Sequence, residues 1–427
     1  MKEDPFPLQT LIAGIDWSKI DSVFSAETDS LAQIAAAGHL DPKSAFRGAR
    51  MVNVSLSGID IRGIDFSFAD LRGTRLREAR LDSTTIIDGA IIDAEDRAAL
   101  GRQGLKKSLS VILCSPRGFC AGEVRAIDTV ERALELYGPP VYVPGPIVHG
   151  QYVLSSFSQK GAIFVEGIDE IPETDAPVIF PVHGVPSAAV AEAKRRNLFV
   201  LDATCPLIIK IHREVRIHFK RGRDEILVVG RATHAQARGI VGQLPLGTMT
   251  VIETLEQANT YIARNPDKLA YVTQSNLSVH GTKTIIEALT RRFPNIRGPY
   301  KTDICYATSN RQAAVAAVAP KVEAMVILGA RNSLNAVSLR DTALLHGCQK
   351  TVLVERAGEI EWPKLGAISS LGISCAVSVP EVIVEELLGI LDDHYEVNVE
   401  SHIAAEENEF FPVPRPLRKV DPTGQVY

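Results

Sequence analysis

Cysteine is scarce in this chain: only six cysteines occur among 427 residues, and they are widely spaced. Small secreted domains held together by disulfides have many closely spaced cysteines, so that class is excluded. The opening residues, Met-Lys-Glu-Asp-Pro, also lack the apolar segment of a secretory signal. We therefore expect a cytoplasmic protein whose thiols are reduced or bind a metal.

The chain also lacks long apolar runs and a large excess of either charge. No run of about 18 apolar residues is present, so no membrane-spanning helix is expected. Hydrophobic residues make up 45% and charged residues 23% of the chain, as in soluble globular proteins. The net charge of −5 gives no electrostatic footprint for a nucleic acid. The length predicts two or more domains.

Three of the six cysteines share one local setting. Cys120, Cys205 and Cys305 each follow a short apolar run and stand at or just before an amphipathic stretch. Their separations of 85 and 100 residues are too long for a zinc knuckle or a ferredoxin loop. They suit three units of fold that each deliver one thiolate, at a helix N-terminus that stabilises negative charge, to a shared point. Three thiolates can hold an iron–sulfur cluster with one iron left open for a substrate.

The alternative for any single cysteine is burial as a small apolar residue. Cys114, Cys348 and Cys375 lie among apolar residues and are interpreted in this way. The repeated setting makes a ligand role the better interpretation for the other three.

A five-residue period marks the N-terminal part of the chain, and Phe46 and Met51 begin it. A period of five fits neither a helix nor a strand. The pattern resembles the pentapeptide repeat, a four-sided right-handed β-helix whose apolar residues point inward. The inward positions are then Leu56, Ile61, Phe66, Leu71, Leu76, Leu81, Ile86 and Ile91.

Eight such repeats make only about two coils, and a short stack needs covered ends. Residues 16–37 and 93–104 are the expected capping helices. The alternative is an irregular, loop-rich leader. No residue of this segment has catalytic character, so an interaction or scaffold role is the default expectation.

From Leu109 onward, apolar strands alternate with helices. Strands expected at 141–143, 177–183, 225–230 and 324–329 each lead into a loop with polar residues. Continuous apolar strands of this kind indicate buried parallel sheets, whose function lies at the carboxyl ends of the strands. The fold class is therefore α/β.

Several motifs in this part of the chain occur together and in order: Arg117-Gly-Phe-Cys-Ala-Gly122, His183-Gly-Val185, Asp202-Ala-Thr-Cys-Pro-Leu207, Asp303-Ile-Cys-Tyr-Ala-Thr308, Asn310-Arg-Gln312 and the tail from Glu407 to Arg418. They resemble the 4-hydroxy-3-methylbut-2-enyl diphosphate reductase family, the last enzyme of the non-mevalonate route to isoprenoids. The resemblance covers roughly residues 109–418 and leaves out the first hundred or so.

This resemblance implies a fold and a chemistry. The fold is a trefoil of three α/β lobes around a central [4Fe–4S] cluster, which Cys120, Cys205 and Cys305 hold with one iron open. Two electrons and two protons remove the allylic hydroxyl of the substrate as water, giving isopentenyl and dimethylallyl diphosphates. A ferredoxin or flavodoxin is the implied electron donor.

The resemblance also implies a substrate site. Histidine, hydroxyl and amide donors near helix starts suit a diphosphate. The residues at matching positions are His149, His183, His234, Ser275, Asn276, Ser333, Asn335 and Ser378. Taken singly, each histidine is equally a satisfied polar group in a loop.

The chain departs from the family pattern where the proton is supplied. Position 236, at which the family has a catalytic glutamate, is Gln236, which has no titrating proton. Asn276 and Leu334 also differ from the usual hydroxyl residues. Three interpretations stay open: a pathway reductase with another proton source, a paralogue reducing a different allylic diphosphate, or a non-catalytic cluster-containing binding or redox-sensing module.

The expected divisions follow from these patterns: a leader or helical cap over 1–45, a β-helix over 46–93, a capping helix and linker over 94–108, and a reductase domain over 109–420 with lobes at about 109–205, 206–300 and 301–400 and a tail returning to the first lobe.

Overall fold

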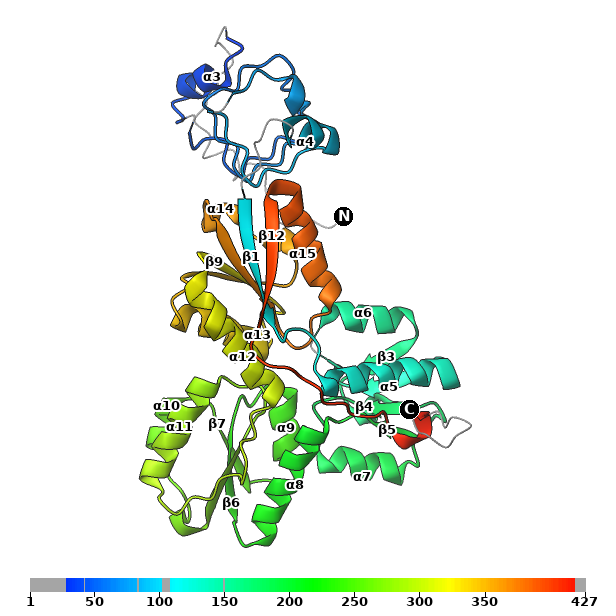
Figure 1. The fold of residues 1–427 in the computed structure, drawn as a ribbon. Coiled ribbons are helices and arrows are strands. Elements are labelled where there is room, and N and C mark those ends of the chain that lie inside the picture. The colour runs from blue at the N-terminus through cyan, green and yellow to red at the C-terminus, as the bar shows by residue number, and fades with distance from the viewer. Residues whose placement is uncertain (1–27, 42, 83, 102–107, 149, 419–427) are drawn as a thin grey trace, which may run out of the picture. The chain divides into compact units, whose positions relative to one another are not determined.

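The computed structural model describes residues 28–418, apart from 42, 83, 102–107 and 149 (Figure 1). Contacts divide the chain into two compact units. The first comprises residues 1–111, 360–370 and 386–399, and the second comprises 112–359, 371–385 and 400–427. Within the described ranges, every helix is too short or too polar to span a bilayer.

In the first unit, residues 50–91 form stacked turns that pair with one another in parallel. Isolated bridges join Arg50 to Asp70 and Asp60 to Arg80, each across 20 residues. Four five-residue repeats therefore separate one level from the next. The inward positions from Leu56 to Leu76 are at most 2% exposed and belong to one apolar core.

The register of this core changes after Leu81. Ile86 and Ile91, which the five-residue count places inside, are 39% and 41% exposed. Their neighbours Ile87 and Ile92 pack against the core instead. Because the bridges to Ile86 and Ile91 span 21 residues, one extra residue after Leu81 moves the inward position by one. The prediction that Ile86 and Ile91 point inward is wrong for this reason.

Short helices flank the stacked turns. Helix α3 spans Leu31–Ala37 and α4 spans Ala94–Gly101, while the 3-10 helix η1 spans Leu76–Glu78. The rest of the two predicted capping helices, 16–27 and 102–104, lies outside the described residues. Helix α14, Trp362–Leu365, belongs to the same unit, and its Trp362 ring stacks on Phe68 with ring centroids 6.4 Å apart.

The first of three sheets lies in the second unit and is fully parallel, in the order β3-β2-β4-β5. Its strands are β2 Val141–Pro144, β3 Ala162–Val165, β4 Val178–Phe180 and β5 Val200–Asp202. Its helices are α5 Ala121–Tyr137, α6 Gln151–Gln159, α7 Ser187–Arg195 and the 3-10 helix η2 Ile168–Glu170.

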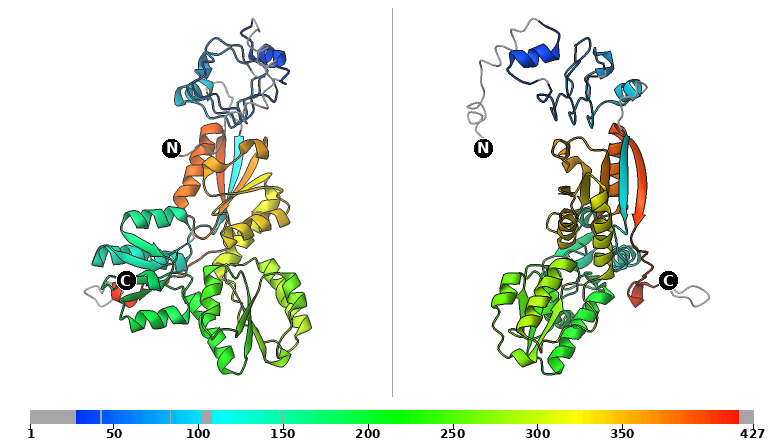
Figure 2. Two further views of the ribbon diagram at one scale, coloured as in Figure 1. Left: turned by 180° about the vertical axis from the view of Figure 1, so that it is seen from behind. Right: turned by 60° about the vertical axis from the view of Figure 1, so that its left-hand side comes forward.

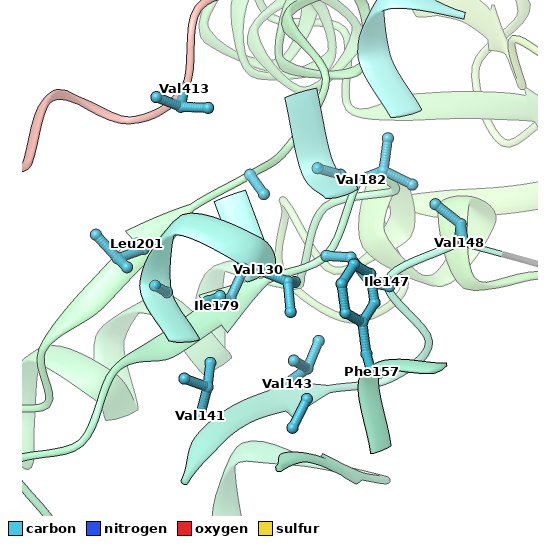
Figure 3. Packing of buried hydrophobic residues seen from close by; sticks show 14 of the residues in the cluster. Val130, Val141, Val143, Ile147, Val148, Phe157, Ile179, Val182, Leu201 and Val413 are labelled. Carbon is cyan, nitrogen blue, oxygen red and sulfur yellow. The ribbon is translucent and has the colours of Figure 1, made fainter. Parts of the chain in front are cut away.

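Alternate residues of these strands pack on opposite faces of the sheet, as the period of a strand requires. Val141 and Val143 pack with Val130 of α5 and Phe157 of α6 (Figure 3). Tyr142 packs on the other face, in a cluster with Ala193 of α7. Val413 from the C-terminal tail also joins the first cluster.

The second sheet is parallel in the order β7-β6-β8, with helices on both of its faces (Figure 1, Figure 2). Ile226 and Val228 of β6 pack towards α8 and α9, and Leu227 and Val229 pack towards α10 and α11. The elements are α8 Pro206–Lys220, β6 Glu225–Val229, α9 Ala235–Val241, β7 Met249–Ile252, α10 Leu255–Thr260, η3 Pro266–Lys268, β8 Leu269–Thr273 and α11 Val279–Arg292.

The third sheet has the order β10-β9-β11-β1-β12. Strand β9 pairs in parallel with β10 and with β11. The elements are β1 Ser108–Ser115, α12 Tyr306–Val318, η4 Ala319–Lys321, β9 Ala324–Leu328, α13 Leu334–Leu345, β10 Lys350–Val354, η5 Ala357–Glu359, β11 Ser370–Cys375, α15 Glu381–His394 and β12 Glu396–Ile403. The 3-10 helix η6, Arg415–Leu417, follows in the tail, and its Leu417 packs in the cluster of the first sheet.

Strand β1 lies in this third sheet, although the sequence assigns residues 109–205 to the first lobe. The apolar sequence of a strand predicts that the strand is buried in a sheet but does not identify the sheet. The pairing of strands depends on contacts that are distant in sequence. The first lobe therefore begins at α5.

Polar loop residues follow the carboxyl ends of the strands in all three sheets. His183 follows β4, Cys205 follows β5, His234 follows β6, Ser275 follows β8 and Ser333 follows β9. In parallel sheets this is the edge at which binding sites form.

Candidate functional site

One cavity in the second unit is lined by all three of the singled-out cysteines. The wall contains residues from all three lobes. Besides Cys120, Cys205 and Cys305, it comprises Gly122, Glu123, Val182, His183, Leu207, Ile208, Ser275, Asn276, Ala307, Thr308, Ser333, Asn335, Val377 and Ser378.

Each cysteine is the N-cap residue of a helix: Cys120 of α5, Cys205 of α8 and Cys305 of α12. Backbone hydrogen bonds fix two of these positions. The amide of Cys205 donates to the carbonyl of Val182 at 3.0 Å, and the amide of Cys305 donates to the carbonyl of Ser275 at 2.9 Å. Cys305, at the start of a third-lobe helix, is thereby tied to the loop after β8 in the second lobe.

Gly122 lets the thiols approach one another. A Cβ atom at this position would lie 2.8 Å from the Sγ of Cys205 and 3.7 Å from the Sγ of Cys120. The first of these distances is a clash, so any side chain larger than hydrogen displaces the Cys205 thiol.

Burial controls the protonation of the three thiols. Burial raises the pKa of Cys120 well above its usual value, raises that of Cys205, and raises that of Cys305 to about 11. The expected lowering by the helix N-termini is therefore outweighed in the metal-free protein, because desolvation disfavours the thiolate. A bound cationic group reverses this balance, since it supplies the charge that buried thiolates lack.

The chemistry of the donor set fits an iron–sulfur cluster, because cysteine thiolates are the usual ligands of such clusters. Three thiols face one cavity from three helix N-termini.

Arg311 connects the cysteine-bearing segments. Its side chain is 1% exposed and donates to the carbonyl of Gly118 at 2.8 Å, two residues before Cys120. It also forms an ion pair with Glu407 of the tail at 2.9 Å. Since Arg311 belongs to α12, which begins after Cys305, one buried guanidinium holds two cysteine loops and the tail together.

Glu123 is the carboxyl group in the cavity wall. It is 5% exposed, and its Oε1 accepts a hydrogen bond of 2.5 Å from Ser378. Its Oε2 is buried and has no hydrogen-bond partner. Burial raises the pKa of this carboxyl to about 7, so a large share of the group carries a proton at neutral pH.

Two of the predicted histidines lie close together. The rings of His183 and His234 are 5.3 Å apart between centroids and meet edge to face. The Nδ1 of His234 accepts a hydrogen bond from the amide of Gln236, so the proton of the neutral ring lies on Nε2. That Nε2 atom is 3.3 Å from the side-chain amide of Asn276 in the cavity wall. His149, the third predicted histidine, lies outside the described residues.

Ser333 and Asn335 stand at the start of α13. Ser333 is its N-cap and accepts a hydrogen bond from the amide of Ala336. Asn335 accepts from the amide of Val377 at 3.1 Å, and its Nδ2 atom is buried without a hydrogen-bond partner. A hydroxyl and an unused amide donor therefore face the cavity from the third lobe.

Known proteins resemble this chain over the part that carries the cavity. A family model described as LytB protein matches residues 111–392, which is more than half of the chain. The chain belongs to the LytB family. A second model, pentapeptide repeats in eight copies, matches residues 44–86 and bears out the repeat identified from the five-residue period.

Curated relatives within the family carry the same enzyme name, 4-hydroxy-3-methylbut-2-enyl diphosphate reductase. The "4-hydroxy-3-methylbut-2-enyl diphosphate reductase 2" of Rhodopseudomonas palustris is 56% identical and covers 73% of this chain and 98% of its own length. The reductase of Beijerinckia indica is 50% identical and covers 74% of this chain and 98% of its own length. A solved structure of the Plasmodium falciparum reductase has a TM-score of 0.67 at 28% identity and covers 73% of this chain and 97% of that one.

The departures from the LytB pattern have distinct places in the structure. Gln236 is fully buried and is not in the cavity wall, and its side-chain amide donates to the hydroxyl of Ser275 at 3.1 Å. Leu334 lines a different hollow, with Arg231 and Asp341. The amide of Gln236 is thus already bonded to a wall residue, and Leu334 takes no part in the cavity.

Sequence reasoning missed Glu123, although it lies next to the first cysteine motif. The available signal was a carboxylate at the third position after a predicted ligand, on the first turn of the following helix. That signal is weak, because acidic residues are common in first helical turns as partners of the helix dipole. Only its burial beside Ser378 separates Glu123 from that ordinary role.

Proposed function

We propose that this chain is an iron–sulfur oxidoreductase that converts 4-hydroxy-3-methylbut-2-enyl diphosphate into isopentenyl and dimethylallyl diphosphates. The carbon–oxygen bond of the allylic hydroxyl breaks, two electrons and two protons are consumed, and water leaves. The observation that carries the proposal is the cavity in which Cys120, Cys205 and Cys305 meet hydroxyl, amide and imidazole groups. Family membership and relatives of 50–56% identity support it.

The same proposal includes the cofactor. Cys120, Cys205 and Cys305 hold a [4Fe–4S] cluster in a trefoil of three lobes, and when bound the cluster supplies Lewis acidity and electrons. A ferredoxin or flavodoxin supplies the electrons, and the repeat segment is a short right-handed β-helix.

The diphosphate binds to neutral hydrogen-bond donors. We assign this role to His149, His183, His234, Asn276, Ser333, Asn335 and Ser378. For His234 the supporting observation is that its neutral tautomer has the ring proton on Nε2, on the side of Asn276. For Asn335 it is the buried Nδ2 atom without a partner.

The proton supply is rearranged relative to the LytB pattern. Gln236 orients the Ser275 hydroxyl through the 3.1 Å hydrogen bond and does not itself donate a titrating proton. Glu123 is the cavity carboxyl whose raised pKa of about 7 keeps a share of it protonated near neutral pH, and its Oε1 accepts a hydrogen bond from Ser378. Glu123 therefore supplies the proton that, in the LytB pattern, comes from a glutamate at the position of Gln236.

The test is anaerobic turnover of 4-hydroxy-3-methylbut-2-enyl diphosphate by the iron-loaded chain, compared with Gln236→Glu and Glu123→Gln. Wild-type activity is expected, together with a loss of about 10²-fold or more in Glu123→Gln, the usual effect of removing a general acid. A silent wild type with an active Gln236→Glu variant would instead favour the paralogue or the binding module. An iron-free, colourless protein after anaerobic reconstitution would contradict the cluster.

A further inference from the structure

Another hollow lies on the second lobe, shares no lining residue with the cysteine cavity, and has a strongly cationic lining. Five cationic side chains line it against a single carboxylate, Glu214. The remaining lining residues are neutral, since burial lowers the pKa of His218. The cationic residues are Lys210, Arg213, Arg221, Arg223 and Arg297. We call this hollow the basic groove.

Among the described residues, Lys210 is the one cation of the basic groove that forms ion pairs, with Glu214 and Asp303. Arg213, Arg221 and Arg297 form no ion pair with any residue in the described ranges, and all three are exposed. Some exposed arginines elsewhere do form ion pairs, for example Arg195 with Glu192 at 2.6 Å and Arg340 with Asp341 at 2.7 Å. The whole chain has a net charge of −5, whereas the groove is positively charged.

The groove begins close to two of the cysteines. Helix α8 starts at its N-cap Cys205, and Lys210 is five residues along it, a rise of about 8 Å. The Nζ atom of Lys210 forms an ion pair of 3.2 Å with Asp303, two residues before Cys305. The inner end of the groove is therefore joined by one helical turn and one ion pair to the segments that carry Cys205 and Cys305.

The composition of the groove suits a protein partner. Ile217 and Tyr300 lie among the cations, and Tyr300 is 95% exposed. Exposed aromatic and apolar groups surrounded by arginines are typical of protein–protein interfaces. Complementary charge at such a surface speeds encounter with an acidic partner and repels basic proteins.

We propose that the basic groove is the docking surface for a small acidic protein that delivers electrons one at a time to the cysteine cavity. This inference rests on the proposed function, because that reaction consumes two electrons for each hydroxyl removed as water. Two successive dockings of a one-electron carrier supply them, and the carrier leaves oxidised each time.

The experiment uses the full-length, iron-loaded chain with two reductants in parallel: a reduced acidic [2Fe–2S] ferredoxin and reduced methyl viologen, which needs no protein surface. The variant is Arg213→Glu/Arg221→Glu/Arg297→Glu. The control is Arg291→Glu, an exposed arginine of α11 without an ion pair in the described residues. We expect the KM for ferredoxin to rise about tenfold or more in the triple variant and to stay within about twofold in the control. Turnover with methyl viologen stays at the wild-type level in both.

Binding of oxidised ferredoxin, measured by calorimetry at low and high salt, separates the docking surface from the reaction. If neither reductant supports turnover, the proposed function fails. The calorimetric binding of oxidised ferredoxin then still tests whether the groove is a docking surface. A triple variant that binds ferredoxin as tightly as the wild type overturns the docking surface. Binding of a single-stranded oligonucleotide to the groove, with no binding of ferredoxin, overturns it as well.

Discussion

At the scale of single residues, the site depends on which polar groups lose their contact with water. Glu123, Asp303 and Cys205 are buried and Cys120 and Cys305 are half-buried, and desolvation raises the pKa of each. Asp303 keeps a pKa of about 6 although Lys210 and the amide of Thr273 both bond to it. Desolvation therefore outweighs the nearby charge in this part of the molecule.

Glu123 makes stability depend on pH. Its pKa is about 7 in the folded protein against 4.5 for an ordinary glutamate, so the folded state holds a proton that the unfolded state releases. The contribution of the protonated Glu123 side chain to the free energy of unfolding is fully present below pH 4.5 and is lost as the pH rises through about 7. Above that range the ionised carboxyl costs roughly 3 kcal/mol at most.

We therefore expect Glu123→Gln, which has no such titration, to gain stability relative to the wild type between pH 5 and pH 8. Urea unfolding of both proteins, prepared without metal, measures the difference at each pH. An equal change in the two proteins over this range would show that Glu123 is not held protonated by the fold.

At the scale of elements, the repeat segment shows how one residue changes the side chains that a core receives. The five-residue count is correct from Leu56 to Leu76 and fails after Leu81. The extra residue widens the bridge spacing from 20 to 21, and all later inward positions move with it. Neighbouring isoleucines then have opposite environments.

The pair Ile91 and Ile92 tests this register directly. Ile92 is 9% exposed and belongs to the core, while Ile91 is 41% exposed. We expect Ile92→Asp to destabilise the repeat segment by several kcal/mol, because it places a carboxylate in an apolar core. Ile91→Asp is the matched control and should change stability by only about 0.5 kcal/mol. Limited proteolysis within residues 44–93 measures both, and equal sensitivity of the two variants would restore the unbroken count.

At the scale of the whole molecule, the cysteine cavity assembles only when the three sheets are in place. The Cys120 loop follows β1 of the third sheet, Cys205 follows β5 of the first sheet, and the amide of Cys305 is bonded to the loop after β8 of the second. A group bound by all three thiols therefore adds a further link between segments that apolar packing, backbone hydrogen bonds and Arg311 already connect.

Removal of iron should accordingly lower the Tm of the second unit. A ligand that binds only the folded state stabilises that state, and structural metal sites behave in this way. We expect the anaerobic, iron-loaded chain to melt several degrees higher than the chelated chain, a difference that Cys305→Ser abolishes together with the brown colour. Cys348→Ser is the control, since Cys348 lies in a separate apolar cluster and its loss leaves the iron content unchanged. A chelated chain that melts at the same temperature as the loaded one would contradict a cluster that links the lobes.

The features that depend on local chemistry can be predicted from the amino-acid sequence. Helix starts at Cys120, Cys205 and Cys305, the α/β rhythm from residue 109 and the repeat up to Leu76 all follow from neighbours within a few positions. The order of the motifs also pointed to the LytB family. Each of these is a property of short segments, so a single chain carries enough information to predict it.

The tertiary structure alone decided what depends on distant partners. It placed β1 in the third sheet, turned Gln236 towards Ser275, and buried Glu123 beside Ser378 from a segment 255 residues away. It also gathered Arg297 with the cations of α8 into the basic groove. Desolvation and sheet pairing depend on everything that surrounds a group, and those surroundings exist only once the chain has folded.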